Sequence, residues 1–238
     1  MREKSAMGNA LEGESYVGKS TTIEIMREFK EVRDSGIFVV PEYTVMGTLP
    51  KFPRETKWDI KQAIQTMIDL EKRRTDMLTN DLSKKDGDGI VVFDRGPISC
   101  IAFEYAAEHA GFTGASLWMA ESFQKEIEDG NIIVPAGMIY LTAPRKIIEQ
   151  REKDHIAKGH RNILDFLKNN EVIGSLNEAF RVFGDHLPEQ LFLTLSTGNK
   201  NPNEVGAEVL QFIKDQPKDI LDNVPDFIAY ANSLIDKK

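Results

Sequence analysis

Residues 13–20, GESYVGKS, match the pattern G-x-x-x-x-G-K-[ST], which is typical of a loop wrapped around phosphates. Such a loop aims successive backbone N–H groups at an anion, and glycines supply the backbone angles that this requires. A helical pattern begins directly after the loop, so the positive end of that helix would face the same anion. We expect the phosphate contacts to come from Gly13, Ser15, Tyr16, Val17, Gly18, Lys19, Ser20 and Thr21.

Two of these residues carry specific chemistry. Lys19 has the length to reach the β- and γ-phosphates of a nucleoside triphosphate, and the Ser20 hydroxyl is a hard oxygen ligand for Mg²⁺. The loop therefore predicts ATP and Mg²⁺ as cofactors. A chance match in a glycine-rich turn is the alternative, and the helix and strand patterns around the loop favour the nucleotide site.

Charged residues follow two apolar runs, where a parallel sheet would place its ligands. Glu42 follows the run 37–40, and Asp94 and Arg95 follow the run 90–93. We expect Asp94 to hold Mg²⁺ opposite Ser20, and Arg95 to bind a phosphate or the reacting oxygen of an acceptor. For Glu42 three roles stay open, namely general base, substrate contact and loop cap. For Asp94 and Arg95 the alternative is a solvated ion pair at a turn.

The apolar runs predict the elements that position these residues. Each lacks alternation and is rich in β-branched or aromatic residues, as in strands buried on both faces. Helical periodicity between the runs predicts a three-layer αβα fold with a five-stranded parallel sheet. The first strand must precede Gly13, although residues 6–11, AMGNAL, are poor strand formers. The other four strands are expected at 37–40, 90–93, 138–141 and 191–195.

Composition sets the class of protein. The 238 residues have a net charge of −8 and a single cysteine, Cys100, so no intramolecular disulfide can form and a reducing cytoplasm is expected. The acidic balance disfavours a nucleic-acid polymer as partner, and no apolar stretch is long enough to predict a membrane span. We expect one domain over residues 1–216 with a C-terminal helical extension, 217–238, packed on it.

The order of the motifs resembles a known family. Residues 93–103, FDRGPISCIAF, come after the loop and Glu42, and residues 140–144, YLTAP, lead to Arg151. Residues 195–199, LSTGN, follow the last run. Together these motifs resemble the thymidylate kinase and deoxynucleoside kinase branch of the phosphate-loop kinases, over about residues 10–215.

The resemblance implies transfer of the γ-phosphoryl group of ATP to a nucleoside or a nucleoside monophosphate. It implies a phosphate-loop nucleotide kinase fold with a lid helix at about 145–161, on which Arg151 would neutralise the transferred phosphate. It also implies that Thr197 and Gly198 lie beside adenine, that Ser99 lies at the acceptor, and that the protein forms a homodimer. Pro41 stands before Glu42 where thymidylate kinases have an arginine, so the phosphorylation state of the acceptor stays open.

Two further groups of residues predict where the acceptor would bind. Arg73 and Arg74 lie in a helical pattern over 63–82, and one of them would hold the acceptor or its phosphate; a surface pair is the alternative. Phe52 and Phe103 would stack on a base or belong to the core.

A nucleotide-dependent switch is the competing function, but 199–202, NKNP, lacks the aspartate of a guanine-binding element.

Overall fold

The computed structural model describes residues 6–84, 89–159, 165–217 and 224–236, in which five parallel strands form one sheet of order β2-β3-β1-β4-β5. This confirms the predicted α/β fold with a five-stranded, all-parallel sheet. Four strands coincide with the apolar runs to within a residue or two at each end. The strands are β1 (Asn9–Glu12), β2 (Ile37–Val40), β3 (Ile90–Asp94), β4 (Gly137–Thr142) and β5 (Phe192–Ser196).

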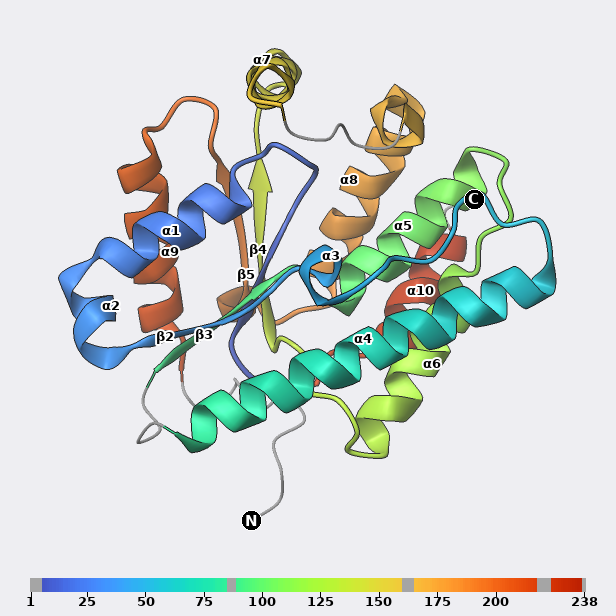
Figure 1. Ribbon diagram of the computed structural model, residues 1–238, viewed down its shortest axis with the longest axis horizontal. Coiled ribbons are helices and arrows are strands. Elements are labelled where there is room, and N and C mark those ends of the chain that lie inside the picture. The colour runs from blue at the N-terminus through green and yellow to red at the C-terminus, as the bar shows by residue number, and fades with distance from the viewer. Residues whose placement is uncertain (1–5, 85–88, 160–164, 218–223, 237–238) are drawn as a thin grey trace.

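Helices cover both faces of the sheet (Figure 1). One face carries α1 (Lys19–Glu28), α2 (Lys30–Ser35) and α9 (Pro202–Asp215). The other carries α4 (Lys57–Ser83), α5 (Pro97–His109), α6 (Ser116–Glu128), α8 (Asn170–Asp185) and α10 (Phe227–Ile235). The remaining helices are α3 (Tyr43–Met46), α7 (Arg145–Ala157) and the short 3-10 helices Asp165–Lys168 and Glu189–Leu191.

Alternating residues of the strands feed the two halves of the core. Leu11, Val92 and Ile139 pack with α1 and α9, whereas Met138 and Tyr140 pack with α5, α6 and α8. Side chains on successive strand residues point to opposite faces, so central strands covered on both sides are apolar throughout. This is why runs without alternation predicted the strands correctly.

The first strand departs from this pattern because it carries a buried amide. Asn9 is 0% exposed, and its amide exchanges two hydrogen bonds with Gln216 just after α9, Nδ2 to Oε1 at 2.7 Å and Nε2 to Oδ1 at 2.9 Å. A Cβ on Gly137 of the neighbouring strand would lie 2.4 Å from Asn9 Oδ1, so glycine leaves the room that the amide needs. The polar residue that made this segment a poor strand candidate is thus fully paired.

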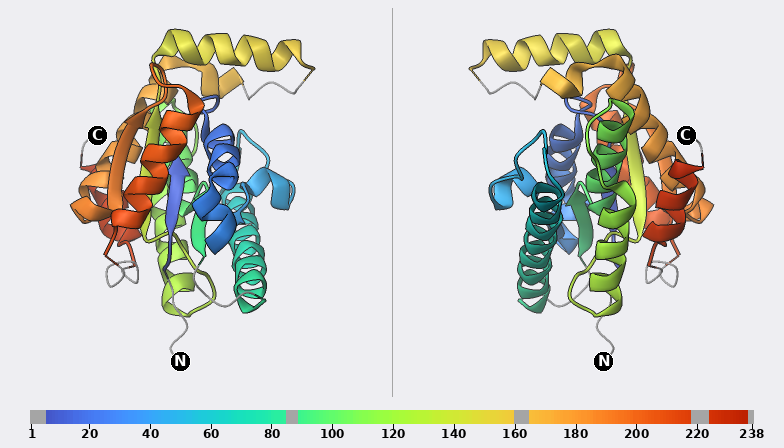
Figure 2. Two further views of the ribbon diagram at one scale, coloured as in Figure 1. Left: turned by 90° about the vertical axis from the view of Figure 1, so that its left-hand side faces the viewer. Right: turned by 90° about the vertical axis from the view of Figure 1, so that its right-hand side faces the viewer.

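The central strand β1 marks the point where the connections reverse. The chain passes from β1 to β2 on one side, and from β3 across to β4 on the other. Ligands of open parallel sheets bind beyond the strand ends at such a point. Helix α7 begins three residues after β4 and lies across this end of the molecule (Figure 2). The lid helix expected at 145–161 is therefore helical over Arg145–Ala157, and residues 160–161 lie outside the described residues.

The C-terminal helix α10 packs on the body of the protein. Phe227, Tyr230 and Leu234 are buried, and the Phe227 ring stacks on Phe183 of α8 at a centroid distance of 5.7 Å. Residues 218–223 of the expected extension lie outside the described residues. In the parts of the chain that the structure describes, no helix combines the length and apolar character needed to cross a bilayer.

Candidate functional site

A cavity of about 1050 Å³ opens at the carboxyl ends of the strands, and most of the predicted site residues line it. It is walled by the loop 13–20, by the ends of β2 and β3, by α5 and by α7. Ligand pockets commonly measure roughly 300–1,000 Å³, so this cavity is slightly larger than the top of that range. The predicted residues in its wall are Gly13, Ser15, Tyr16, Val17, Gly18, Lys19, Ser20, Thr21, Glu42, Phe52, Asp94, Arg95, Ser99, Phe103, Arg151 and Thr197.

The loop 13–20 takes backbone angles that favour glycine at two of its positions. Gly13 has φ of 131°, and a Cβ there would lie 2.3 Å from the Leu141 carbonyl oxygen. Gly18 has φ of 112° and precedes α1 without a capping side chain. Tyr16 adopts φ of 64°, which is rare for a bulky residue, and its ring lies 5.2 Å from that of His155 on α7. The loop is thus held tightly between β4 and α7.

Lys19 closes the loop on itself. Its Nζ donates to the carbonyl oxygens of Gly13 and Glu14, both at 3.0 Å, and the side chain is 7% exposed. Burial, together with the nearby charge of Arg95, lowers the pKa of Lys19 to about 7. An added anion would favour the charged ammonium, so the site is suited to a phosphate group.

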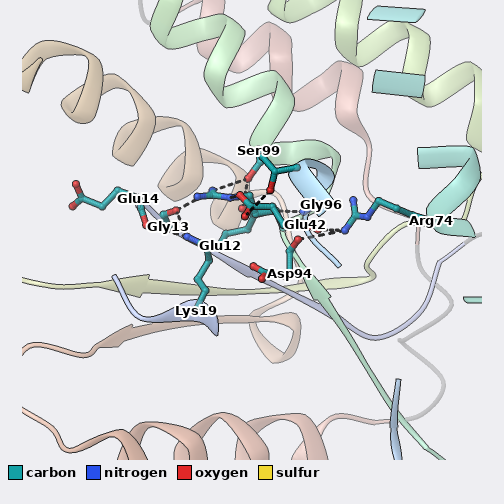
Figure 3. A network of polar contacts seen from close by, with 11 residues as sticks. Glu12, Gly13, Glu14, Lys19, Glu42, Arg74, Asp94, Gly96 and Ser99 are labelled. Atoms are coloured by element: carbon teal, nitrogen blue, oxygen red, sulfur yellow. Dashed lines mark hydrogen bonds and ion pairs between the residues drawn. The ribbon is translucent and has the colours of Figure 1, made fainter. Parts of the chain in front are cut away.

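Arg95 joins the loop 13–20 to the segment that follows β2 and to the first turn of α5. Its Nε donates to Glu42 Oε1 at 2.8 Å, and its Nη1 donates to the Gly13 carbonyl at 3.1 Å and to Ser99 Oγ at 3.3 Å. Arg95 has φ of 68°, so the chain turns sharply between β3 and α5. Figure 3 shows Glu42, Asp94 and Ser99 close together at this turn. Three segments far apart in sequence therefore meet at one guanidinium.

Glu12, which the sequence analysis did not select, lies beneath this turn. It is 0% exposed and does not line the cavity; it accepts hydrogen bonds from the Gly96 N–H at 2.6 Å and from Ser99 Oγ. Its carboxylate therefore caps α5, which begins after Gly96. Burial raises the pKa of Glu12 to about 7, although Arg95 and these hydrogen bonds act against the rise. Only its place next to Gly13 could have signalled it.

The two strand-end carboxylates are in different electrostatic environments. Burial opposes the charge of Glu42, but Arg95 outweighs it and the pKa of Glu42 is lowered. Burial raises the pKa of Asp94, against the attraction of Lys19. Asp94 Oδ1 is buried and, among the described residues, has no hydrogen-bond partner. The charge of Glu42 is thus balanced by Arg95, whereas Asp94 keeps one carboxylate oxygen that can still bind a ligand.

The donor set around Asp94 fits a magnesium ion. The buried Asp94 Oδ1 and the exposed hydroxyl of Ser20 line the same cavity, and both are oxygen ligands. Within the described residues, no three His, Cys, Asp or Glu side chains cluster as a metal cage. Mg²⁺ is typically held by one or two protein oxygens together with phosphates and water, so two ligands suffice.

Arg151 docks on the back of the loop. Its Nη1 donates to the Val17 carbonyl at 2.8 Å and to Thr197 Oγ1 at 3.0 Å, and its Nη2 donates to the Thr197 carbonyl at 3.1 Å. Thr197 Oγ1 in turn donates to Val17 at 2.6 Å. Gly198, expected beside adenine, is not in the cavity wall. A Cβ there would lie 2.3 Å from Pro144 Cδ, so this glycine packs closely against Pro144. Arg151 therefore connects α7 to the loop 13–20 and to the residue that follows β5.

The expectation for Arg74 is corrected by its position. It is 0% exposed, pairs with Glu71 at 2.7 Å, and donates through Nη2 to the Arg95 carbonyl at 2.5 Å. Figure 3 shows it reaching the network on the side away from Lys19. Arg74 supports the Arg95 turn from beneath the cavity, because it projects from the buried face of α4. Its neighbour Arg73 is exposed and is not in the cavity wall either.

The far wall holds an ion pair that the sequence analysis missed. Arg54 and Glu104 meet at 2.5 Å, and both line the cavity next to Phe52 and Phe103. The two aromatic rings lie edge to face, with centroids 5.2 Å apart. A separation of 50 residues between Arg54 and Glu104 leaves no spacing pattern from which the pair could be predicted.

No family model matches the chain, and a search of curated proteins finds no relative.

Proposed function

We propose that this protein is an enzyme that transfers the γ-phosphoryl group of Mg-ATP to a nucleoside or a nucleoside monophosphate. The observation that carries the proposal is the single cavity that joins the loop 13–20 to Glu42, Asp94 and Arg95. A donor and an acceptor can lie side by side there, and most of the catalytic effect in such transfers comes from positioning and charge stabilisation.

The loop and Lys19 hold the triphosphate. The N-terminus of α1 carries no capping side chain, so its N–H groups are free to meet an anion. Lys19 already donates to carbonyls at the mouth of the loop and would exchange those bonds for phosphate oxygens. Ser20 and Asp94 would hold Mg²⁺, which supplies positive charge to the phosphates when bound.

Arg95 and Glu42 serve the acceptor. The acceptor oxygen attacks the γ-phosphorus, the bond to the β,γ-bridging oxygen breaks, and ADP leaves. With a hydroxyl acceptor, Glu42 takes the proton; with a monophosphate, Arg95 binds the phosphate that attacks. Arg95 also faces the charge that develops on the moving group, because its Nη1 reaches Gly13 of the loop.

Acceptor-dependent release of ADP tests this function. Protein with Mg-ATP is incubated with each common nucleoside and nucleoside monophosphate, and the phosphorylated product is identified by mass spectrometry. We expect turnover with at least one acceptor, and its loss in Lys19→Met. Lys125→Met is the matched control, since Lys125 is an exposed residue of α6 paired with Asp129. ADP release that is indifferent to every acceptor would contradict the proposal and favour a nucleotide-dependent switch.

A further inference from the structure

A buried ion pair forms part of the cavity wall rather than of the core. Arg54 Nη1 donates to Glu104 Oε2 at 2.5 Å, and the two side chains are 5% and 2% exposed. Both line the cavity. Nothing in the proposed chemistry of Lys19, Asp94 or Arg95 uses them.

The pair is incompletely satisfied by the protein. Taking two charges out of water costs about as much as their attraction returns, so stability alone does not account for such a pair. Arg54 Nε is buried and has no hydrogen-bond partner among the described residues. Burial also raises the pKa of Glu104 against the pull of Arg54. A ligand that accepts from the guanidinium would satisfy the unpaired Arg54 Nε–H, and a group on it that donates to Glu104 would stabilise the charged carboxylate.

Flat apolar surfaces flank the pair. Phe103 precedes Glu104 on α5, and Phe52 lies two residues before Arg54. The Arg54 guanidinium lies 5.8 Å from the centroid of the Phe52 ring. Aromatic faces beside a polar pair are suited to a planar heterocycle whose edge carries hydrogen-bonding atoms.

The length of α5 separates this pair from the reacting end of the cavity. Arg95 lies just before the first turn of α5, and Glu104 lies seven residues after Pro97. At a rise of 1.5 Å per residue this is roughly 10 Å along the helix. An acceptor with its hydroxyl or phosphate at Arg95 could therefore place a ring at Glu104.

We propose that Arg54 and Glu104 select the acceptor by hydrogen bonding to the polar edge of its nucleobase, reading a donor and an acceptor atom that lie next to each other. This inference rests on the proposed function, since it assigns the ring of the acceptor to this end of the same cavity. Arg54 donates to a ring nitrogen or carbonyl oxygen, and Glu104 accepts from an amino group or a ring N–H.

The test replaces the ion pair by two amides. In the double variant Arg54→Gln with Glu104→Gln the side chains can still bond to each other, as the buried amides of Asn9 and Gln216 do. Both amides can donate and accept, so the fixed pattern of donor and acceptor is lost. Thymidine, deoxycytidine, deoxyadenosine, deoxyguanosine and their monophosphates are titrated by calorimetry into the full chain without ATP.

We expect the dissociation constants of the wild-type protein to differ by at least about tenfold between bases, and those of the double variant by less than about threefold. The affinity for Mg-ATP should change by less than about twofold. Arg54 and Glu104 lie far from the loop 13–20 in the sequence, and among the described residues no hydrogen bond or ion pair joins them to it. The control is Lys72→Gln with Glu126→Gln, a pair between α4 and α6 at 2.9 Å that does not line the cavity. It should keep the wild-type order of bases.

Two outcomes overturn the inference. Wild-type protein that binds none of these compounds has no base site, and a double variant that keeps the wild-type order of bases shows that the pair does not read them. Either result leaves Mg-ATP binding and acceptor-dependent ADP release as separate tests of the proposed function. If the double variant does not bind Mg-ATP, and so has not folded, the single variant Glu104→Gln is judged by the same comparison.

Discussion

Glu12 and Ser99, 87 residues apart in sequence, share a hydrogen bond beneath the cavity, in which the Ser99 hydroxyl donates to the buried carboxylate. The same carboxylate accepts from Gly96, so one side chain of β1 fixes the start of α5. Arg95 and Ser99 are oriented together by this contact. The end of the central strand therefore fixes the positions of Arg95 and Ser99 in the cavity wall.

Replacing Glu12 by glutamine should change how stability depends on pH. Because burial raises the pKa of Glu12 from 4.5 to about 7, the folded protein keeps a proton that the unfolded chain releases between these values. Wild-type stability should thus fall as pH rises through this window, by on the order of 3 kcal/mol at most. Glutamine has no proton to lose, so the stability of Glu12→Gln relative to wild type should increase from pH 5 to pH 7.5.

Urea unfolding of both proteins at the two pH values measures this difference. Ser122→Ala, whose hydroxyl donates to the Trp118 carbonyl of its own helix, is a control that should shift both values equally. A difference between Glu12→Gln and wild type that does not vary with pH would show that Glu12 is ionised throughout.

Asp94→Asn should raise the Mg²⁺ concentration that catalysis requires, and lower kcat, without destabilising the fold. Burial raises the pKa of Asp94, so the folded state resists its charge, and a neutral amide should be at least as stable at pH 7. The lost ligand should lower kcat by about 100-fold or more. Turnover at increasing Mg²⁺ and thermal unfolding are measured on the same preparation. A large fall in unfolding temperature would instead assign Asp94 a structural role.

Glu42→Gln should separate catalysis from binding. If Glu42 takes the proton of a hydroxyl acceptor, kcat should fall by about 10²–10⁴ while the KM for ATP stays within about twofold. Thr44→Val removes only the hydroxyl that donates to Glu42 at 3.3 Å and should retain most of the activity.

The pH profile gives an independent check on Glu42. Burial opposes its charge, but Arg95 lowers the pKa of Glu42 below the ordinary 4.5, so the carboxylate is ionised across the neutral range. The wild-type rate should therefore show no loss from protonation of Glu42 above pH 5. An acid limb near pH 6 that disappears in Glu42→Gln would be incompatible with this ion pair.

Arg151→Lys should weaken ATP binding more than it slows transfer. Lysine cannot reproduce the four hydrogen bonds to Tyr16, Val17 and Thr197. We expect the KM for ATP to rise about tenfold, with kcat within about threefold of wild type. Lys146→Gln, an exposed change on the same helix, is the control. A fall in kcat at unchanged KM would mean that Arg151 acts on the transferred phosphate, as the family resemblance implies.

The sequence was most informative where residues near in the chain act together. The loop 13–20 and the strand-end positions of Glu42 and Asp94 are local patterns, and they meet in one cavity. Arg74 was placed wrongly because helical spacing alone does not distinguish the buried face of α4 from the face toward a ligand. Glu12 and the pair of Arg54 with Glu104 depend on contacts across 50 or more residues, which no spacing encodes.

The bond between Asn9 and Gln216 sets a condition on the order of assembly. The two residues are 207 positions apart, so at roughly 5–20 residues per second a ribosome makes the second about 10–40 s after the first. Until Gln216 is made, the Asn9 side chain in β1 lacks its hydrogen-bond partner in an otherwise apolar core. The strand β1 therefore leaves the ribosome well before Gln216, the residue that completes the hydrogen bonding of its buried amide.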